Sequence, residues 1–512
     1  MKILDCTIRD GGYYNHWDFS LPIAEKYFRS MNQLPIDILE IGYRSRPQKN
    51  YEGKYFYCPD FVIEQARNWA PSKELAIMLN EKDCRIEDLD YLLTPCNGLI
   101  NTIRMAIAPS RFLDALELAE GIKKRGFKVG FNIMYMSTLS VDTPFFNHIS
   151  KLNGLVDYFS LVDSYGGIYP EKVREIIGIC KSATSIPIGF HGHNNIELAF
   201  ANSLSAIEAG CELVDATIMG MGRGAGNLKT ELWLTHCSTK EGLNVDFNIL
   251  GELVSQFEEL QNVYQWGTNL PYMVSGANSL PQKDVMDWVT KRFYSINSII
   301  RALHNQKNGE QDNLKLPEFM PENKLKRALV VGGGPSILEH LNGLLTFLRN
   351  NPDIGIVHAS SKHANIFREL PNRQFYCLVG NEGHRMENVF NGLENVTGEC
   401  ILPPFPRKMG TYLPNAMKAR SFELRKVLFN NKIDDSHTAL ALQVSIDLGV
   451  DTIYIAGYDG YPNQSVSGKE QDLINENNYL FNKAITHFKS IAAITPSRYE
   501  INEQLSLYQL VS

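Results

Sequence analysis

The sequence predicts an α/β protein with an N-terminal (β/α)8 TIM barrel, a helical extension and a C-terminal doubly wound α/β domain. Three observations predict this fold class. A chain of 512 residues is too long for a single hydrophobic core. Short apolar runs alternate with segments of helical period, and a polar stretch with two prolines divides the chain. We therefore expect the barrel at 1–238, the extension at 239–304, the linker at 305–326 and the second domain at 327–512.

Eight apolar or β-branched runs in the first 238 residues are the expected barrel strands. Amphipathic segments such as 111–124 and 171–181 separate them, as the helices of β-α units would. Eight such units in this length fit a barrel. The expected strands are Lys2–Leu4, Ile36–Ile41, Leu75–Leu79, Thr102–Ile107, Lys128–Ile133, Tyr158–Val162, Pro187–Phe190 and Leu213–Ile218.

The remaining chain predicts helices first and then a second sheet. A helical stripe runs over 250–263, and 285–302 reads as one further long helix. After the linker, a strand at Arg327–Val331 leads into a glycine-rich turn and a helix that ends near Arg349. More strands at 354–359, 374–379 and 452–456, with a helix at 436–448, indicate an open, doubly wound domain.

Composition excludes several classes of protein. Fifty Lys and Arg residues against 57 Asp and Glu give a net charge of -7, without the basic excess typical of nucleic-acid binding. No apolar run approaches the roughly 20 residues that span a membrane. The N-terminus lacks a signal-peptide pattern, so we expect a cytoplasmic protein. None of the nine cysteines is spaced C-x-x-C, which argues against disulfides and thiolate zinc sites.

A metal site is predicted where the first and seventh strands end. His191 and His193 lie two residues apart, so both imidazoles point to the same side of a strand. Asp10 follows the first strand and could supply an oxygen ligand, since both strands end at the barrel mouth. Two imidazoles and one carboxylate accept Mn, Mg, Zn or Co. The alternative is that both histidines only form hydrogen bonds with neighbouring strand ends.

Three motifs in this order resemble one known family of barrels. They are LDCTIRDGGY at 4–13, GFHGHNN at 189–195 and the glycine-rich loop GMGRGAGN at 220–227. They resemble the signature of the metal-dependent pyruvate aldolase, acyl-CoA lyase and 2-isopropylmalate synthase superfamily. Segments 201–234 and 272–288 are most similar to 4-hydroxy-2-oxovalerate aldolases, and the resemblance covers roughly residues 1–300. It implies that Asp10, His191 and His193 bind a divalent metal, that Arg9 stabilises an enolate and that Asn227 completes or supports the site.

The proton-transfer group and the substrate contacts stay open at this point. The similar aldolases carry a histidine base where this chain has Tyr13. Tyr13 could serve, or His16, whose ordinary pKa is closer to neutral; a purely structural Tyr13 is the third reading. Ser164 is a candidate substrate ligand. Glu40 and Arg104 are candidates too, or else they form a buried ion pair.

The turn Gly332-Gly333-Gly334-Pro335-Ser336 predicts a phosphate-binding loop. It does not match a dinucleotide fingerprint, because Ile337 stands where the third glycine belongs. This turn and the segment 448–461 resemble a Rossmann-like group that includes bacterial sialyltransferases and flagellin-glycosylation domains. The resemblance implies that Gly333, Gly334 and Ser336 contact a nucleotide or nucleotide-sugar phosphate, with Asp459 near the ligand. The alternative is a scaffold that only packs on the barrel or mediates assembly.

The predicted function is a divalent-metal-dependent aldolase that joins or cleaves pyruvate and an aldehyde. Its small-molecule substrates would be a 2-oxo acid and an aldehyde, and pairing with a sugar-nucleotide domain suggests, by analogy, sugar-acid or surface-glycan biosynthesis. We expect a homo-oligomer. Two alternatives remain: a Claisen-type enzyme that uses acyl-CoA on the same barrel, or a nucleotide-binding, glycosyltransferase-like protein whose activity lies in the C-terminal domain.

Overall fold

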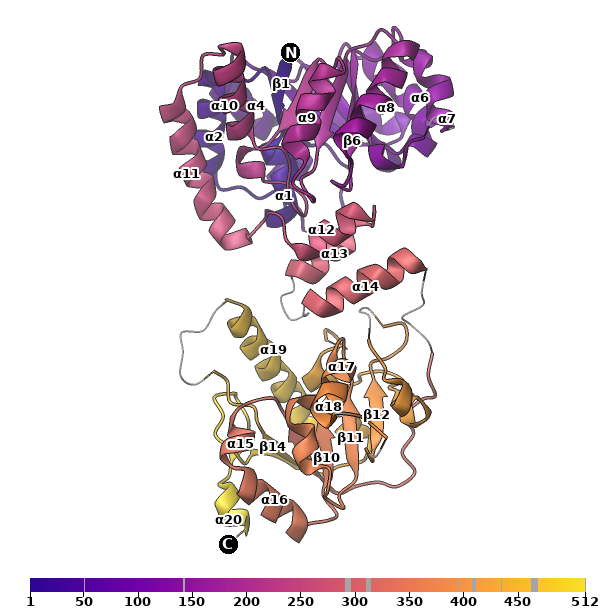
Figure 1. Cartoon of the computed structure of the whole chain (residues 1–512). Helices are drawn as coiled ribbons and strands as arrows, with labels where there is room; N and C mark the ends of the chain where they lie inside the picture. The colour runs from indigo at the N-terminus through magenta and orange to yellow at the C-terminus, as the bar shows by residue number, and fades with distance from the viewer. Residues whose placement is uncertain are drawn as a thin grey trace. The chain divides into compact units, whose positions relative to one another are not determined.

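The computed structural model describes residues 1–49, 51–140, 143–290, 296–309, 315–394, 396–407, 411–433, 435–461 and 468–511. The chain divides into two compact units, Met1–Asp287 and Trp288–Ser512 (Figure 1). The predicted linker at 305–326 contains residues 310–314, which lie outside the described residues. The predicted limits at 238, 304 and 326 stay predictions.

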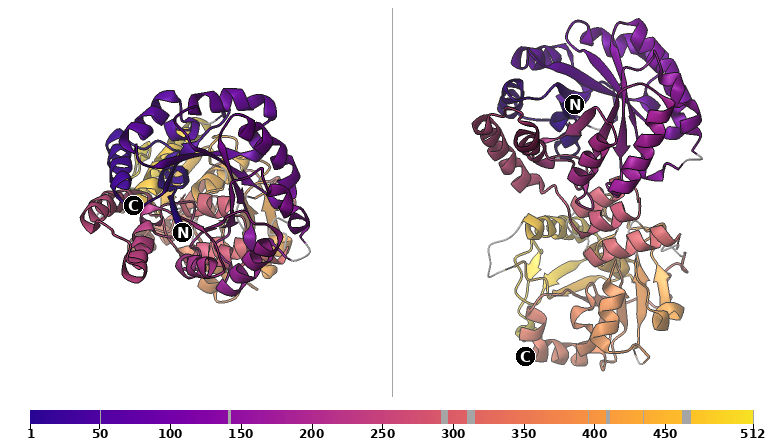
Figure 2. Two further views of the ribbon diagram at one scale, coloured as in Figure 1. Left: turned by 90° about the horizontal axis from the view of Figure 1, so that it is seen from above. Right: turned by 45° about the horizontal axis from the view of Figure 1, so that its top comes forward.

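The first unit is a closed barrel of eight parallel strands, as predicted. Each strand pairs with the next, and β1 pairs with both β2 and β8, which closes the sheet. Helices surround the strands on the outside (Figure 2). The strands are β1 (Lys2–Asp5), β2 (Ile38–Tyr43), β3 (Glu74–Asn80), β4 (Thr102–Ile107), β5 (Lys128–Ile133), β6 (Tyr158–Asp163), β7 (Ile188–Gly192) and β8 (Leu213–Ala216).

Side chains alternate between the two faces of the barrel wall. In β4, Ile103, Met105 and Ile107 pack into the large apolar cluster beneath the helices, while Arg104 between them takes the other face. The helices of this layer are α1 (Thr7–Asn15), α2 (Leu21–Gln33), α3 (Lys54–Tyr57), α4 (Asp60–Trp69), α5 (Leu89–Leu93), α6 (Phe112–Lys124), α7 (Pro144–His148), α8 (Pro170–Ala183), α9 (Ala199–Glu208) and α10 (Thr230–Glu241).

The segment that follows the barrel is helical, and side-chain caps fix two of its helix starts. Asp246 caps α11 (Phe247–Tyr264) by accepting hydrogen bonds from the amides of Asn248 and Ile249. Asn269 caps α12 (Leu270–Ala277). Where one helix was expected over 285–302, the described residues form α13 (Gln282–Thr290) and α14 (Ile296–Asn308), and 291–295 lie outside them.

The second unit contains one sheet of eight parallel strands. Their order is β13-β12-β11-β10-β9-β14-β15-β16, so the chain starts at β9 in the middle and builds outward on both sides. The strands are β9 (Arg327–Val331), β10 (Gly355–His358), β11 (Gln374–Cys377), β12 (Glu399–Leu402), β13 (Ser421–Glu423), β14 (Thr452–Ala456), β15 (Ser490–Ala493) and β16 (Glu503–Gln504).

Helices cover both faces of this sheet. Val330 packs in one apolar cluster with Leu440, while its neighbour Val331 packs in another with Leu344. A strand with both faces buried reads as a continuous apolar run, as the sequence of β9 does. The helices are α15 (Ser336–Glu339), α16 (Leu341–Asn350), α17 (Glu382–Phe390), α18 (His437–Asp447), α19 (Gly468–Ala484) and α20 (Leu507–Val511).

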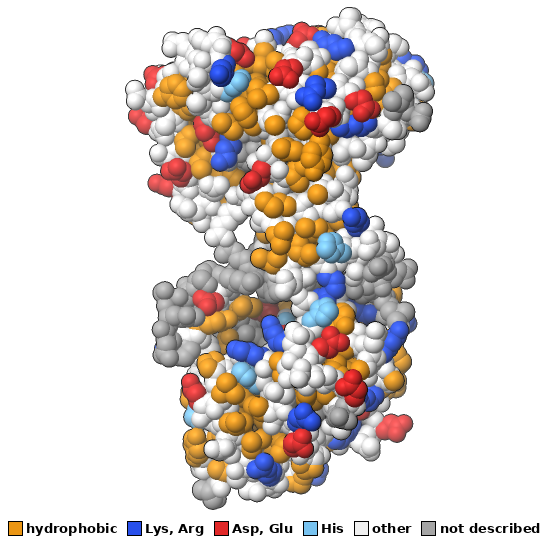
Figure 3. All heavy atoms as spheres, in the orientation of Figure 1, with side chains coloured by type: hydrophobic (Ala, Val, Ile, Leu, Met, Phe, Trp, Pro, Cys, Tyr) orange, Lys and Arg blue, Asp and Glu red, His pale blue; other side chains and the backbone are white. Residues whose placement is uncertain are grey.

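The surface agrees with the charge balance of the sequence. On the face drawn in Figure 3, acidic and basic side chains are interspersed and form no broad basic patch. Within the described part of the chain, no helix combines the length and the apolar character needed to cross a membrane.

Candidate active site

Helix α1 carries the first group of predicted site residues. The sequence placed Asp10 at the end of a strand, whereas the structure places it in the first turn of α1, directly after β1. Arg9 and Asp10 are buried, and Tyr13 lies one turn further and is half-buried. His16 follows the end of the helix; its side chain is 70% exposed and its Nδ1 lies 3.6 Å from a Glu52 carboxylate oxygen.

The end of β7 supplies the two histidines, which are both buried. One ligand atom each from Asp10, His191 and His193 can be chosen so that all three lie within 4.8 Å of one another. The Nε2 atom of His191 lies 3.7 Å from Oδ2 of Asp10. The structure therefore brings the three predicted ligands together at one end of the barrel.

The glycine-rich loop places Asn227 beside these ligands. An isolated antiparallel bridge joins Asn227 to His193, and the Asn227 side-chain amide donates a hydrogen bond to Asp10. A Cβ at Gly222 would lie 2.4 Å from the Asn227 amide nitrogen and 2.9 Å from Oδ2 of Asp10, so only glycine permits this approach. The Oδ1 atom of Asn227 is buried and has no hydrogen-bond partner among the described residues.

Below the site, one layer of the barrel interior is polar. Glu40, Arg104, Ser160 and Asp215 come from β2, β4, β6 and β8, the alternate strands that share a layer in such barrels. Arg104 donates to Asp215 at 2.7 Å, to Ser160 at 3.2 Å and to Glu40 at 3.2 Å. Glu40 and Arg104 thus form an ion pair, which was one of the two readings of the sequence, and both side chains are fully buried.

Two members of this layer contact the candidate metal site, Asp215 through His191 and Glu40 through Arg9. Asp215 lies 3.1 Å from Nδ1 of His191, so it can orient the imidazole and leave Nε2 directed toward Asp10. Glu40 accepts a hydrogen bond from Nε of Arg9 at 2.7 Å, and Arg9 also donates to Asp10. Sequence reasoning missed Asp215; its signal was a lone acidic residue in an otherwise apolar strand.

The electrostatics of this cluster suit a cation. Burial and the neighbouring His191 lower the pKa of His193 well below its ordinary value, so this imidazole is neutral. Burial raises the pKa of Asp10, but the neighbouring Arg9 guanidinium, helped by the hydrogen bond from Asn227, outweighs it and lowers the pKa overall. Two buried arginines, Arg9 and Arg104, then face three buried carboxylates, those of Asp10, Glu40 and Asp215. A bound cation would offset the remaining negative charge.

A second candidate donor group shares His191. Cys6, His191 and Asp215 also lie within 4.8 Å of one another. Cys6 packs in an apolar cluster with Leu4 and Ile38, and its thiol donates to the carbonyl of Ala216. The Asp215 carboxylate of this group is already paired with Arg104 at 2.7 Å. The donor set of Asp10, His191 and His193, together with the unpaired Asn227 oxygen, is therefore the one that fits a divalent metal.

Two further residues border the site. The hydroxyl oxygen of Ser164 accepts a hydrogen bond from the Tyr135 amide at 2.9 Å. Arg223, the one charged residue of the glycine-rich loop, was not singled out in the sequence. Its guanidinium carbon lies 5.7 Å from the centre of the Tyr13 ring, and it donates to the Ser164 carbonyl at 3.3 Å.

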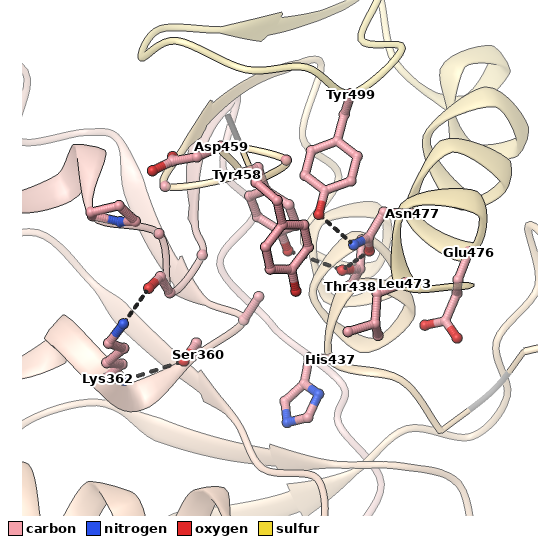
Figure 4. A pocket seen from close by; sticks show the side chains of 18 of the residues that line it. Ser360, Lys362, His437, Thr438, Tyr458, Asp459, Leu473, Glu476, Asn477 and Tyr499 are labelled. Carbon is pink, nitrogen blue, oxygen red and sulfur yellow. Dashed lines mark hydrogen bonds between the residues drawn. The ribbon is translucent and has the colours of Figure 1, made fainter. Parts of the chain in front are cut away.

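The predicted nucleotide-binding residues lie together in the second unit. Gly333, Gly334 and Asp459 line a cavity of about 850 Å³ (Figure 4). Ser336 donates hydrogen bonds from both its amide and its hydroxyl to the Asp459 carboxylate. The prediction that these residues contact a phosphate stays a prediction.

Comparison with known proteins assigns the family of the barrel. A family model described as HMGL-like matches residues 103–254. The chain is 49% identical to a 4-hydroxy-2-oxovalerate aldolase of Carboxydothermus hydrogenoformans over 243 residues, which cover 45% of this chain and 69% of that protein. The chain belongs to the HMGL-like family.

Other relatives of this HMGL-like chain include an oxaloacetate decarboxylase of Mycobacterium tuberculosis. That protein is 26% identical over 237 residues, 45% of this chain and 67% of its own length. A solved structure of the N-terminal domain of a candidate aldolase from Bacteroides vulgatus is 53% identical. It covers 59% of this chain and all of that domain, with a TM-score of 0.56. The family and its relatives support lyase activity for the barrel.

Proposed function

We propose that the barrel is a divalent-metal-dependent lyase that forms the enolate of a pyruvate-type 2-oxo acid and joins it to, or releases it from, an aldehyde. The observation that carries this proposal is the convergence of Asp10, His191 and His193 within 4.8 Å, beside the Arg9 guanidinium. Similarity to 4-hydroxy-2-oxovalerate aldolases supports the choice of reaction.

Asp10, His191 and His193 would hold the metal, and Asn227 would complete or support the site. When bound, a divalent cation supplies Lewis-acid stabilisation of the charge that develops on the 2-oxo oxygen. This donor set accepts Mn, Mg, Zn or Co.

Arg9 stabilises the negative charge of the enolate in this proposal. Its hydrogen bonds to Glu40 and Asp10 fix the guanidinium before substrate arrives, so little reorganisation is needed during the reaction. Glu40 and Arg104 therefore act as positioning residues, because both side chains are fully buried and engaged in the polar layer. Ser164 stays the candidate for a direct substrate contact.

We assign the proton transfer to Tyr13 rather than to His16. Tyr13 stands three residues after Asp10 on α1, which places both on the same side of the helix. Its ring also contacts Arg223 of the glycine-rich loop. His16 faces Glu52 at the surface instead. The aldol step needs a group that takes or returns the proton of the substrate hydroxyl.

Exchange of the pyruvate methyl protons with deuterated water, followed by NMR, tests the enolate step. We expect exchange with metal present, and loss of exchange on chelation and in Asp10→Asn. Exchange that survives both treatments would refute the proposed mechanism. Adding aldehydes to the same assay then identifies the second substrate.

Oxaloacetate decarboxylation is a second candidate, favoured by the Mycobacterium tuberculosis relative. Loss of CO2 from oxaloacetate leaves the same enolate, so the same residues would serve. Decarboxylation needs no group to accept a hydroxyl proton, and Tyr13→Phe should therefore leave it unaffected while it slows aldol cleavage. Measuring CO2 release and aldehyde release in this variant separates the two activities.

A further inference from the structure

The cavity in the second unit lies where an open sheet most often binds ligands. β9 has β10 on one side and β14 on the other, so the strand order reverses direction between β9 and β14. Ligands of such sheets bind beyond the carboxyl ends of the strands at this point. Gly332–Gly334 follow β9, and Gly457–Asp459 follow β14, and both segments line the cavity. Its volume of about 850 Å³ is within the range of small-molecule sites.

The glycine loop itself has little capacity to hold an anion. The amides of Gly332 and Gly334 donate to the carbonyls of Ala456 and Gly457, both at 2.8 Å. The Ser336 amide donates to Asp459 at 2.9 Å, so a carboxylate of the protein already occupies that donor. Gly334 approaches this carboxylate so closely that an added Cβ would lie 2.6 Å from it. The loop is thus tied to β14 and serves as a wall of the cavity.

Cationic side chains stand on one side of the cavity. Lys362 is exposed, and its Nζ donates to the Gly333 carbonyl at 3.0 Å. Arg385 is half-exposed; it donates to Glu382 and lies 3.5 Å from the Ser360 hydroxyl. His437 is 43% exposed, and its Nε2 lies 3.6 Å from a Glu382 carboxylate oxygen; burial lowers the pKa of its imidazole, so it adds a hydrogen-bonding group rather than a charge. Lys362 forms no salt bridge with any described carboxylate, so its charge is available to a ligand.

The opposite side offers hydrogen-bonding and aromatic groups. Figure 4 shows Glu476, Asn477 and Tyr499 across the cavity from Lys362. Asn477 accepts from Thr438 at 2.6 Å and donates to the Tyr499 hydroxyl at 3.3 Å, which fixes this wall before a ligand enters. A ligand with an anionic group at one end and a hydroxylated ring at the other would satisfy both sides.

We propose that this cavity binds a phosphate ester of a hydroxylated ring, a nucleotide or a sugar phosphate, and that Lys362 and Arg385 hold its phosphate. Arginine binds phosphate oxygens in pairs, while lysine acts as a point charge, and the two together suit a phosphate better than a single carboxylate. The hydroxylated ring of the ligand then lies toward Asn477 and Tyr499.

Calorimetric titration of the full chain tests this proposal. CMP, UMP, ADP and glucose 1-phosphate are titrated into metal-free protein carrying Asp10→Asn, which removes the barrel metal site as a competing phosphate ligand. Cytidine, which lacks the phosphate, and glucuronate, a hydroxylated ring that carries a carboxylate and no 2-oxo group, are the comparison ligands. We expect at least one phosphate ester to bind and both comparison ligands to bind at least tenfold more weakly.

Lys362→Met supplies the decisive variant, and Lys324→Met is its matched control. Each lysine is exposed and donates to one backbone carbonyl, but Lys324 contacts Asp447 outside this cavity. We expect Lys362→Met and Arg385→Met each to weaken the binding at least tenfold and Lys324→Met to leave it unchanged. Absence of binding by every phosphate ester, equal binding of the carboxylate ligand, or unchanged affinity in Lys362→Met would overturn the proposal.

A second inference concerns Arg223 and rests on the proposed lyase function. The Nε atom of Arg223 is buried and has no hydrogen-bond partner in the described part of the chain, although the residue as a whole is only partly buried. Its one hydrogen bond to a described residue goes to the Ser164 carbonyl, and no described carboxylate pairs with it. The preceding residue, Gly222, packs against Asp10 and Asn227, so Arg223 enters the barrel mouth beside the candidate metal ligands.

We infer that Arg223 selects an aldehyde that carries a negative charge, as a carboxylate or a phosphate. The guanidinium stands next to Tyr13, the group assigned to the substrate hydroxyl, and that hydroxyl belongs to the aldehyde-derived part of the molecule. An anionic group on this part would give Arg223 an ionic partner, which none of the described residues supplies.

Steady-state kinetics with propanal, succinic semialdehyde and glyceraldehyde 3-phosphate test this inference and distinguish the two anions. For Arg223→Gln we expect KM for the preferred charged aldehyde to rise at least tenfold more than KM for propanal, with pyruvate proton exchange retained. Arg125→Gln, which breaks an ion pair with Asp90 away from the mouth, is the control. Equal effects on charged and neutral aldehydes, or loss of pyruvate exchange in Arg223→Gln, would contradict the inference. Absence of exchange in the unmodified protein would instead refute the proposed function.

Discussion

The two candidate sites, one in each unit, hold their charged residues in opposite ways. In the barrel, Arg9, Glu40, Arg104, Asp215 and Asp10 are buried, and each is paired with another member of the group. In the second unit, Lys362 and Arg385 are partly or fully exposed around an open cavity. In a barrel the ends of eight strands converge on one site, whereas in an open sheet the site lies where the strand order reverses and borders fewer strands. The comparison suggests that the barrel charges are fixed for catalysis, whereas Lys362, which forms no salt bridge with a described carboxylate, is available for binding.

The largest effect should come from removing a buried charge. Arg104→Met leaves Asp215 without its arginine partner and Glu40 with Arg9 alone, and breaking such a buried pair costs about 3–5 kcal/mol. Lys362→Met should leave the free energy of unfolding unchanged, because its charge faces solvent. Urea unfolding followed by circular dichroism measures both. Equal stability of the two variants would remove the contrast between the units.

Substitutions of Tyr13 and His16 test which residue transfers the proton in the barrel. Tyr13→Phe should lower kcat of the aldol reaction by about 10²–10⁴-fold, the usual contribution of a general acid or base. His16→Ala should leave kcat within about twofold, because that side chain lies at the surface. Turnover with a neutral aldehyde measures both variants. The reverse pattern would transfer the proton-transfer role to His16.

Asp215→Asn tests whether the polar layer positions a metal ligand. Loss of the carboxylate beside His191 should weaken Mn²⁺ binding about 10–100-fold, as measured by calorimetric titration. Ser160→Ala is the matched control, because Ser160 belongs to the same layer but contacts Arg104 and not His191. Unchanged metal affinity in Asp215→Asn would limit the layer to a structural role.

The smallest effect should be a pH dependence in the cavity. Burial raises the pKa of Glu476 from 4.5 to about 7, with Asp435 adding to the rise. The folded protein therefore holds this proton more tightly than the unfolded chain does, and the resulting stability is present below pH 4.5 and lost as the pH rises through about 7. Glu476→Gln should abolish this part of the decline in Tm between pH 5 and about pH 7.5. An identical pH profile in the variant would contradict it.

Apolar runs and helical periodicity in the sequence predicted most of the strands. The barrel strands and β9, β10, β11 and β14 followed from apolar runs between helical segments. The strands that the sequence did not reveal, β12, β13, β15 and β16, have two to four residues each. Length alone does not explain the difference, because β10 and β11 also have four residues each. The four missed strands are the outer two on each side of the sheet, and they become strands because a neighbouring strand supplies the hydrogen bonds.

The sequence by itself determined the barrel and the three candidate metal ligands. Side chains two residues apart on a strand point the same way, and the carboxyl ends of all barrel strands meet at one mouth, so these residues were expected there. Tertiary structure decided the rest. Arg104 meets Glu40 across 64 residues of sequence and Asp215 across 111. Asp459 reaches Ser336 across 123 residues and occupies the amide that the glycine motif had offered to a phosphate. Such pairings depend on which strands lie opposite or adjacent, and no local pattern encodes that.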